Sequence, residues 1–235
     1  MQRFDITEAQ AWLAAHDEGM ELRWTDAGLT LVGEGLELRG DFTRMLPRLK
    51  QGRLQGEMLV KAAKIKGVEG ELLAVDATAG LGEDSILLAA AGFTVEMFEC
   101  NPVIAALLRD ALARATELPE LASIAARMRL TEANSVDALP QLGYEPDLVL
   151  LDPMFPAKRK DAASKKKMQL FQHMERPCED EEALFRAAFD ANPRKLVVKR
   201  PLKGPYLAGV KPSHSLKGKT IRYDCVLPRT MLRVQ

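Results

Sequence analysis

Cysteine is scarce in this sequence of 235 residues, and its three copies lie far apart, at Cys100, Cys178 and Cys225. Neither a disulfide framework nor a cysteine-bound zinc site has that spacing, so a reducing compartment is expected. The three histidines share no ligand spacing, and no metal site is predicted. No apolar run approaches the length that crosses a membrane, and residues 1–5 do not resemble a signal peptide. We therefore expect a cytoplasmic protein that uses neither a metal nor a membrane.

Charge of one sign is not in excess either, because 33 basic residues balance 33 acidic ones. The balance hides an uneven distribution along the chain. Residues 1–156 contain 14 basic and 25 acidic side chains, whereas residues 157–235 contain 19 and 8. Residues 191–235 have 11 basic side chains against a single acid, Asp224. An asymmetry of this size indicates a polyanion as partner, although a solvated basic surface would show the same pattern.

The clearest local pattern is present in residues 72–84. A short apolar strand over residues 72–76 is followed by a turn of small residues and by a helix that begins near Gly82. This order is typical of the first unit of a doubly wound α/β sheet. Gly80 and Gly82 permit a tight turn and let a ligand approach backbone N–H groups at the start of the helix.

The spacing within this turn, Asp-x-x-x-Gly-x-Gly, differs from the G-x-G-x-x-G pattern that holds a dinucleotide pyrophosphate. Three carboxylates surround the turn, those of Asp76, Glu83 and Asp84. Carboxylates suit a ligand with cationic groups, and S-adenosylmethionine has both an ammonium and a sulfonium. The turn therefore predicts an S-adenosylmethionine site, with candidate contacts at Asp76, Gly80, Gly82, Glu83 and Asp84.

A second unit of the same kind follows and favours a cofactor that contains a nucleoside. Residues 93–99 form an apolar strand that ends in Glu99, 17 residues after Gly82. An acid near this place grips ribose hydroxyls in doubly wound folds. Asn101 and Pro102 then start a helix over residues 102–115, as its N-cap and its first residue.

The remaining elements complete a Rossmann-like sheet that follows a small appendage. Residues 1–55 are expected to form an α+β appendage, with a helix over 7–16 capped by Thr7 and a meander of strands. Residues 56–235 are expected to form the methyltransferase domain, which begins with a helix over 56–66. The other predicted elements are strands 20–24, 29–32, 36–39, 128–132, 147–151 and 196–199, helices 119–127 and 179–192, and an antiparallel hairpin of 213–218 and 220–227.

A polar pair, Asn134 and Ser135, follows the predicted strand over residues 128–132. At the end of the third strand of such a sheet, the pair could contact the edge of an adenine. It could equally be a cap for the next helix, since asparagine and serine are common N-caps. Both interpretations stay open on the sequence alone.

The predicted strand over residues 147–151 runs directly into Asp152-Pro153-Met154-Phe155-Pro156. Ligands of open α/β sheets bind beyond the carboxyl ends of the strands, so this loop lies where chemistry is expected. It resembles the Asp/Asn-Pro-Pro-Tyr/Phe loop of methyltransferases that act on exocyclic amino groups of bases. Asp152 can accept hydrogen bonds from an amino group, Pro153 stiffens the loop, and Phe155 can stack on a base. We predict these three residues to be catalytic.

Together the motifs resemble the RsmJ family of bacterial S-adenosylmethionine-dependent methyltransferases, which modify guanine N2 in small-subunit ribosomal RNA. The matching stretches are residues 75–82, 101–108, 151–156 and 197–201, with weaker similarity over 62–67 and 166–172. The resemblance spans about residues 20–228. It implies a class I methyltransferase fold and methyl transfer to N2 of a guanosine in 16S rRNA, at position 1516 in the family's usual target. The implied partner is 16S rRNA or the small ribosomal subunit.

The same resemblance implies where the cofactor is bound. The positions carried over from the family are Glu83, Asp84, Glu99, Cys100, Asn134, Ser135 and Asp152. The chain departs from the family pattern at Glu83 and Cys100, where the family has arginine. Side-chain contacts are therefore not carried over at these two positions, whereas backbone contacts are.

Basic residues near the loop at Asp152 are predicted to bind RNA phosphates. They are Lys158, Arg159, Lys160, Lys165, Lys166 and Lys167, together with Lys199 and Arg200 at the end of the strand over 196–199. Two rival functions remain: a methyltransferase that acts on another planar amine, such as DNA adenine or a protein amide, and a non-catalytic RNA-binding protein. The acids Asp84, Glu99 and Asp152 count against the second, because they would serve no purpose in an empty pocket beside RNA.

Overall fold

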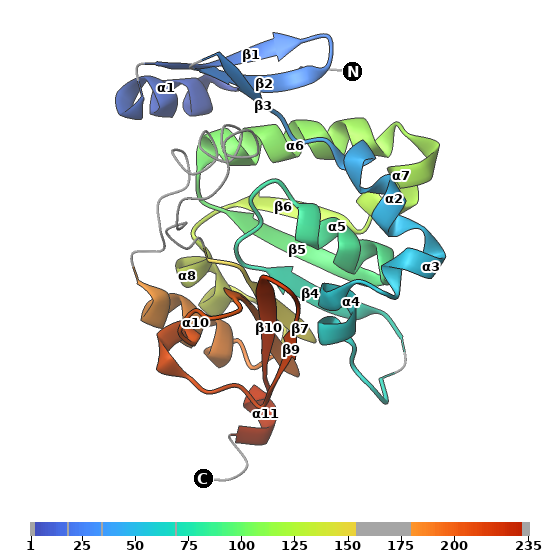
Figure 1. The fold of residues 1–235 in the computed structure, drawn as a ribbon. Helices are drawn as coiled ribbons and strands as arrows, with labels where there is room; N and C mark the ends of the chain where they lie inside the picture. Colours follow the sequence, from blue (N-terminus) through green and yellow to red (C-terminus); the bar gives the residue numbers. More distant parts are fainter. Residues whose placement is uncertain (1–2, 18, 34, 69, 154–179, 232–235) are drawn as a thin grey trace.

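The computed structural model describes residues 3–17, 19–33, 35–68, 70–153 and 180–231 of the chain. Two sheets are present within these ranges (Figure 1). The smaller one is antiparallel and consists of β1 (Met20–Thr25), β2 (Gly28–Gly33) and β3 (Leu36–Leu38). The larger one contains β4 (Leu72–Asp76), β5 (Phe93–Glu99), β6 (Met128–Glu132), β7 (Leu148–Leu151), β8 (Lys195–Pro201), β9 (His214–Lys217) and β10 (Ile221–Val226).

The strands of the larger sheet lie in the order β6-β5-β4-β7-β8-β10-β9. The strands from β6 to β8 are parallel, whereas β10 pairs antiparallel with both β8 and β9. The chain order reverses between β4 and β7, and doubly wound sheets bind their ligands at such a reversal. The predicted α/β class and the predicted final hairpin are both confirmed.

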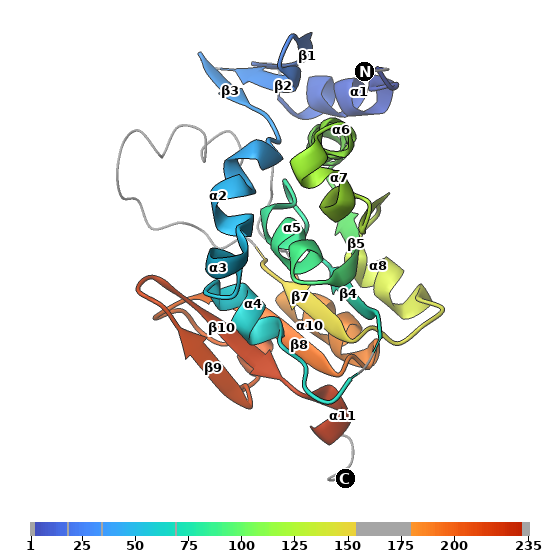
Figure 2. The ribbon, with the colours of Figure 1, turned by 90° about the vertical axis from the view of Figure 1, so that its right-hand side faces the viewer.

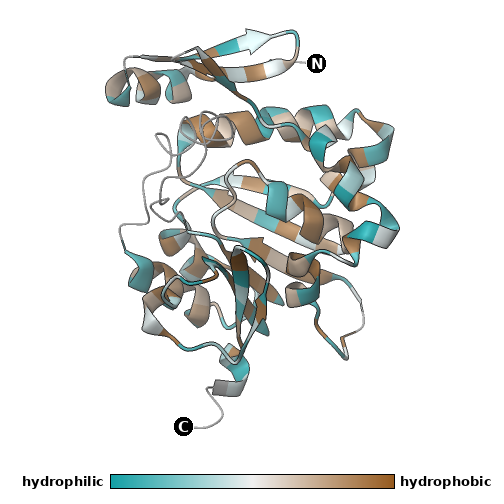
Figure 3. Cartoon of the chain, in the orientation of Figure 1, coloured by the Kyte–Doolittle hydropathy of each residue, from teal (hydrophilic) through white to brown (hydrophobic). Residues whose placement is uncertain are grey.

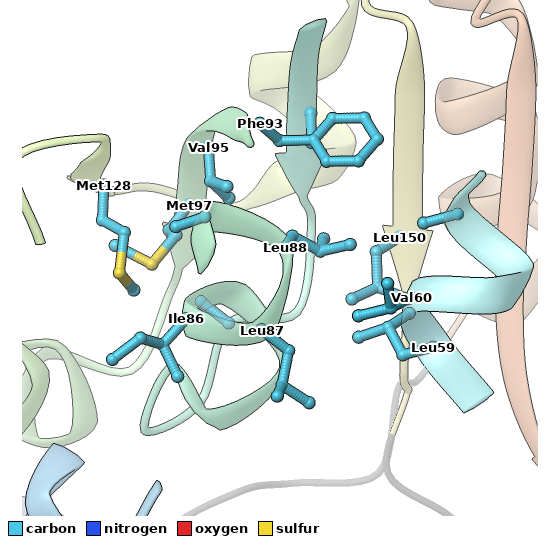
Figure 4. Packing of buried hydrophobic residues seen from close by; sticks show 14 of the residues in the cluster. Leu59, Val60, Ile86, Leu87, Leu88, Phe93, Val95, Met97, Met128 and Leu150 are labelled. Atoms are coloured by element: carbon cyan, nitrogen blue, oxygen red, sulfur yellow. The ribbon is translucent and has the colours of Figure 1, made fainter. Parts of the chain in front are cut away.

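Helices cover both faces of the larger sheet (Figures 1 and 2). One face packs against α4 (Met58–Ala63), α5 (Glu83–Ala90), α6 (Pro102–Thr116) and α7 (Pro119–Ala125), and the other against α8 (Ser135–Ala138) and α10 (Glu181–Asp190). Successive residues of a strand point to opposite faces, so Leu150 of β7 joins the first layer while Val149 and Leu151 join the second. Figure 4 shows the first layer, where side chains of α4, α5, β5 and β7 gather. Shorter elements are η1 (Phe42–Met45), α2 (Leu46–Leu49), α3 (Gln51–Leu54), η2 (Leu139–Gln141), η3 (Leu207–Gly209) and α11 (Pro228–Met231).

The N-terminal helix α1 (Thr7–His16) and the smaller sheet pack on the outer side of α6 (Figures 1 and 2). Val103, Ile104 and Leu107 of α6 share a core cluster with residues of α1, β1 and β2. Leu108 and Ala111, on the other side of the same helix, belong to the core of the larger sheet. The helix α6 is therefore buried on two sides and joins the appendage to the rest of the protein.

A buried carboxylate strengthens this junction. Asp110 of α6 is fully buried, and its Oδ2 accepts hydrogen bonds from the backbone N–H of Leu29 (3.0 Å) and from Nε of Arg114 (2.8 Å). The neighbouring Gly28 has a φ of +117°, and a Cβ there would lie 2.5 Å from Asp110 Oδ2. Only glycine fits this close approach without strain, so the turn between β1 and β2 is matched to α6.

The structure adds short elements that the sequence did not predict, such as η1, α2 and α3, and it differs from the prediction at the ends of two helices. Thr7 does not cap α1; instead Asp5 accepts bonds from the backbone N–H (2.9 Å) and the hydroxyl (2.6 Å) of Thr7. The helix predicted over 56–66 is shorter, because the carbonyls of Ala62 and Lys64 accept hydrogen bonds from Lys195 Nζ (3.0 and 2.6 Å). The division at residue 55 stays a prediction. None of the helices in the described ranges is long and apolar enough to cross a membrane.

Asp110→Ala should lower the free energy of unfolding by about 3 kcal/mol, because it leaves the buried Leu29 N–H and the Arg114 guanidinium without their shared acceptor. Asp110→Asn, which keeps one acceptor oxygen, should lose less. Urea denaturation of both variants measures the difference. A loss below about 1 kcal/mol in Asp110→Ala would show that apolar packing alone holds the appendage on α6.

Candidate active site

The predicted site residues converge at the carboxyl ends of β4, β5 and β7. The turn after β4 bridges the two neighbouring strands through its backbone: Ala77 N–H donates to Leu150 O (3.0 Å), and Ala79 N–H donates to Phe98 O (3.1 Å). The backbone N–H of Asp152, at the exit of β7, donates to Thr78 Oγ1 (2.7 Å). The turn is therefore held from both sides at the point where the sheet order reverses.

Asp76 lies inside this turn. Its side chain is 1% exposed and accepts hydrogen bonds from the hydroxyl of Ser85 (2.5 Å) and the backbone N–H of Thr78 (3.2 Å). Burial raises the pKa of the carboxyl to about 7, and the Ser85 hydroxyl opposes that shift. Asp76 shapes the turn in this structure, and its predicted contact with the cofactor stays a prediction.

The two glycines of the turn have left-handed backbone conformations, with φ of +53° at Gly80 and +75° at Gly82. A Cβ at Gly82 would lie 2.8 Å from Cδ1 of Leu108 and 3.0 Å from Cζ of Phe42. Glycine at position 82 is thus required by the packing of η1 and α6 against the start of α5. The lack of a side chain at position 82 therefore does not by itself indicate a ligand.

Glu99 at the end of β5 is 6% exposed, and each of its carboxylate oxygens already accepts a backbone hydrogen bond. Gly80 N–H donates to Oε2 (3.0 Å) and Asn101 N–H donates to Oε1 (2.8 Å). Burial raises the pKa of Glu99 to about 7, while these N–H groups oppose the shift. Glu99 therefore connects the β4 turn to the start of α6, and each oxygen has a second lone pair for a ribose hydroxyl.

Lys199, which was predicted to bind RNA, forms two ion pairs at the centre of the site. Nζ of Lys199, on β8, lies 2.7 Å from Asp84 Oδ2 and 2.8 Å from Asp152 Oδ2. Burial works against the charge of Lys199, yet the two carboxylates raise its pKa above the usual value for lysine. Burial raises the pKa of Asp152, and Lys199 opposes that shift. The ion pairs join the start of α5, the exit of β7 and the end of β8.

Arg200 is 1% exposed, which contradicts the prediction that it binds RNA. Its Nε donates to Pro205 O (3.0 Å) and its Nη1 to Glu181 Oε1 (3.0 Å). RNA contact by Lys199 stays a prediction, although its ammonium already has two carboxylate partners. Charge counting cannot distinguish an internal ion pair from a surface cation, and this is why both residues were assigned to RNA.

Asn134 caps α8: its Oδ1 accepts a hydrogen bond from Val136 N–H (3.0 Å). The capping interpretation is therefore confirmed, and the contact of Asn134 and Ser135 with an adenine stays a prediction. Asn134 is exposed and Ser135 is buried beside it. Glu83 and Cys100 are exposed at the same edge of the sheet, consistent with access to a ligand.

Pro153 is buried at the end of a described range. The remaining predicted residues lie outside the described residues: Phe155, Lys158, Arg159, Lys160, Lys165, Lys166 and Lys167.

Sequence reasoning missed Thr78 and Ser85, which carry no motif signal, and the internal role of Lys199. Within the described ranges, no cluster of three or more histidine, cysteine or acidic side chains could hold a metal ion.

The strand order, the antiparallel last pair and the carboxylates at the reversal together define a Rossmann-like S-adenosylmethionine-dependent methyltransferase. A family model of SAM-dependent methyltransferases (SAM_MT) matches residues 2–228. The ribosomal RNA small subunit methyltransferase J of Pseudomonas aeruginosa (strain LESB58) is 42% identical over 229 residues, which cover 94% of this chain and 87% of the relative. The chain therefore belongs to the SAM-dependent methyltransferase family, in the group named ribosomal RNA small subunit methyltransferase J.

Two further comparisons agree with this assignment. The protein of the same name from Pseudomonas fluorescens (strain SBW25) is 41% identical over 232 residues, covering 92% of this chain and 88% of the relative. The crystal structure of a SAM-dependent methyltransferase from Neisseria gonorrhoeae superposes with a TM-score of 0.73 at 31% identity, covering 94% of this chain and 92% of that chain. The predicted family, enzyme class and cofactor are confirmed.

The donor set at the site fits S-adenosylmethionine. The cofactor carries an ammonium, a sulfonium and ribose hydroxyls, all of which are stabilised by carboxylates. Glu99 would hold the ribose, and Asp84 and Asp152 would face the cationic part. Lys199 compensates one of these two negative charges, so the site is acidic without holding two uncompensated carboxylates together.

Cofactor affinity should rise between pH 6 and pH 8, because Glu99, with a pKa of about 7 in the free protein, binds ribose hydroxyls better as a carboxylate. A single group of this kind changes affinity by up to about tenfold per pH unit below its pKa. Glu99→Gln should flatten the dependence, as measured by calorimetry at pH 6, 7 and 8. Asp76, whose pKa is also about 7, and Asp152 are present in both proteins, so the difference between the two curves isolates Glu99. Identical curves would remove Glu99 from the cofactor site.

Lys199→Met should raise the pKa of Asp152 further, by about 1–3, because a cation within ion-pair distance lowers the pKa of a carboxyl by that amount. Carbon-13 NMR of the Asp152 carboxyl measures the titration, and Lys199→Arg should preserve most of the wild-type value. Lys195→Met is the matched control, since Lys195 lies on the same face of β8 but binds the carbonyls of Ala62 and Lys64. An unchanged Asp152 titration in Lys199→Met would refute the role of the ion pair.

Proposed function

We propose that this methyltransferase transfers a methyl group to the exocyclic N2 amine of a guanosine in 16S rRNA, in the cytoplasm. Relatives named ribosomal RNA small subunit methyltransferase J support the rRNA substrate. The observation that supports this chemistry is the position of Asp152 at the exit of β7. Its backbone N–H donates to the hydroxyl oxygen of Thr78, and its Oδ2 is paired with Lys199. The side chain keeps 37% of its surface exposed, so an amine can reach it.

S-adenosylmethionine, when bound, supplies a methyl group that is already activated by the positive charge on sulfur. The task of the chain is to hold the amine in line with that methyl group and to stabilise the charge that develops on nitrogen. Lys199 bonds to Oδ2 of Asp152, and Oδ1 is the oxygen expected to accept a hydrogen bond from the amine. As nitrogen forms its new bond to carbon it becomes positive, and the carboxylate stabilises it until its proton is lost.

A guanine N2 lies on the minor-groove edge of a paired base, so the base must be unpaired or flipped out before it reaches Asp152. Flipping costs a few kcal/mol. The predicted stacking on Phe155 would offset part of this cost, at about 1–3 kcal/mol per stacked base.

Another planar amine, such as a DNA adenine or a protein amide, would satisfy the same hydrogen-bonding geometry at Asp152. The names of the relatives favour rRNA over these substrates. The product decides between them. Incubation with tritiated S-adenosylmethionine and separate pools of small ribosomal subunits, naked 16S rRNA and tRNA should label only the first two, with N2-methylguanosine in the nuclease digest. A digest that lacks N2-methylguanosine would overturn the guanine assignment.

Asp152→Asn should reduce kcat for this reaction by about 10²-fold or more, because it removes the negative charge that faces the developing positive charge while preserving side-chain shape. Single-turnover methylation measures the chemical step, and calorimetry with S-adenosylmethionine reports whether cofactor binding survives. Turnover near the wild-type rate would exclude the electrostatic role of Asp152.

A further inference from the structure

Ion pairing divides the cations of the described chain into two groups. Arginines such as Arg48, Arg114 and Arg222 bind acids or backbone carbonyls within the protein. Other exposed cations form no ion pair with a described residue, and five of these lie around α3, after the end of β8 and at the β9–β10 turn: Lys50, Arg53, Lys203, Lys217 and Lys219. We refer to these five as the basic rim. They come from two segments that are 150 residues apart, and the sequence analysis singled out none of them.

The two segments of the basic rim meet in the fold. Lys50 and Arg53 lie in and beside α3, just before α4, while Lys217 and Lys219 flank Gly218 in the turn between β9 and β10. Gly218 packs so closely on α4 that a Cβ there would lie 2.7 Å from the sulfur of Met58. Figure 2 shows α3, α4 and the β9–β10 hairpin together on one side of the molecule.

The basic rim borders the active-site edge of the sheet. Lys203 follows the carboxyl end of β8, two residues beyond the strand's last residue and four beyond Lys199. The backbone of Leu202 donates to Thr220 O (2.8 Å), which joins this loop to the β9–β10 turn. On the other segment, α2 and η1 contact α5. Both segments thus approach the edge where Asp152 lies.

The loop that carries Lys203 is held rigidly by buried arginines. Nη1 of Arg222 donates to the carbonyls of Pro201 (2.7 Å), Leu202 (3.0 Å) and Gly204 (3.0 Å). Arg222 Nη2 and Arg200 Nε both donate to Pro205 O (3.2 and 3.0 Å). A loop fixed in this way presents its lysine at low entropic cost, unlike a lysine on a free loop.

Acids that could neutralise the basic rim are missing or engaged elsewhere. The sequence has no acid between Asp190 and Asp224, and Asp224 is paired with Arg222 (2.9 Å). Between Asp41 and Glu57 there is again no acid, and Glu57 is paired with Arg48 (2.8 Å). The two segments that carry the rim therefore contribute no unpaired acid of their own, in a protein whose net charge is zero.

We propose that the basic rim binds the phosphate backbone of the RNA substrate and orients it across the active-site edge. The inference rests on the proposed function for its choice of polyanion. Lysine and arginine contacts to phosphate position an RNA without reading its sequence. A rim beside the site would place the RNA strand on the α4 and β10 side, with the target base directed toward Asp152.

Three double variants test the proposal: Lys50→Ala with Arg53→Ala, Lys217→Ala with Lys219→Ala, and the control Arg129→Ala with Arg186→Ala. The control removes the same charge from exposed positions on β6 and α10, away from the rim. Affinity for 16S rRNA transcripts is measured between 50 and 200 mM salt. Each rim variant should bind more weakly than wild type and flatten the log–log salt slope by about 1.4–1.8, since each phosphate contact contributes about 0.7–0.9. Affinity for S-adenosylmethionine should not change.

Equal affinity and slope in a rim variant and in the control would overturn the proposal, whether both stay at the wild-type values or both fall together. The proposed function fails by a different result. A wild-type protein that binds 16S rRNA through the rim but forms no N2-methylguanosine would refute the reaction while leaving the rim as an RNA-binding surface.

Discussion

One ammonium group, that of Lys199, holds three elements of the active site in register. It lies between carboxylates from the start of α5 and the exit of β7, at 2.7 and 2.8 Å. Two carboxylates so close together in a partly buried site would favour taking up a proton, because like charges disfavour ionisation. Burial raises the pKa of Asp152, and Lys199 opposes that shift, which favours the carboxylate form that accepts hydrogen bonds. This contact joins the start of α5, the exit of β7 and the end of β8, and it compensates part of the negative charge of the cofactor site.

The neighbouring acids illustrate a second constraint. Asp76 and Glu99 are almost fully buried, and burial raises the pKa of both carboxyls to about 7. Their oxygens accept bonds from Ser85, Thr78, Gly80 and Asn101, which offset the loss of water. Hydrogen bonds to these two carboxylates hold the turn in place. The pKa of each carboxyl lies near neutral pH. A ligand with positive charge therefore favours the ionised form of both groups.

The sequence was sufficient for the sheet, because β7 is a continuous apolar run, as a buried parallel strand is, and β5 and β6 alternate apolar with polar residues. Residues 93–99 and 128–132 were predicted with the bounds that β5 and β6 have. The site was predicted less completely. The strand-end acids converge as expected, but burial and ion pairing are properties of the fold, so Lys199 and Arg200 could not be separated from surface cations. Thr7 failed as a cap because Asp5, two residues earlier, is the stronger acceptor. The basic rim was hidden because its halves meet only in three dimensions.

Because α6 is buried on two sides, the chain cannot be shortened from its N-terminus without exposing apolar side chains. The helix begins at Pro102, after its N-cap Asn101, whose backbone N–H donates to Glu99. Its outer side carries Val103, Ile104 and Leu107 beneath the appendage. A chain shortened to begin at β4 would leave that side of α6 in water, and exposed apolar patches promote association. It would also release the helix that fixes Glu99. The N-terminal module thus covers an apolar face of the helix that starts beside Glu99, although the site contacts of the described residues lie outside it.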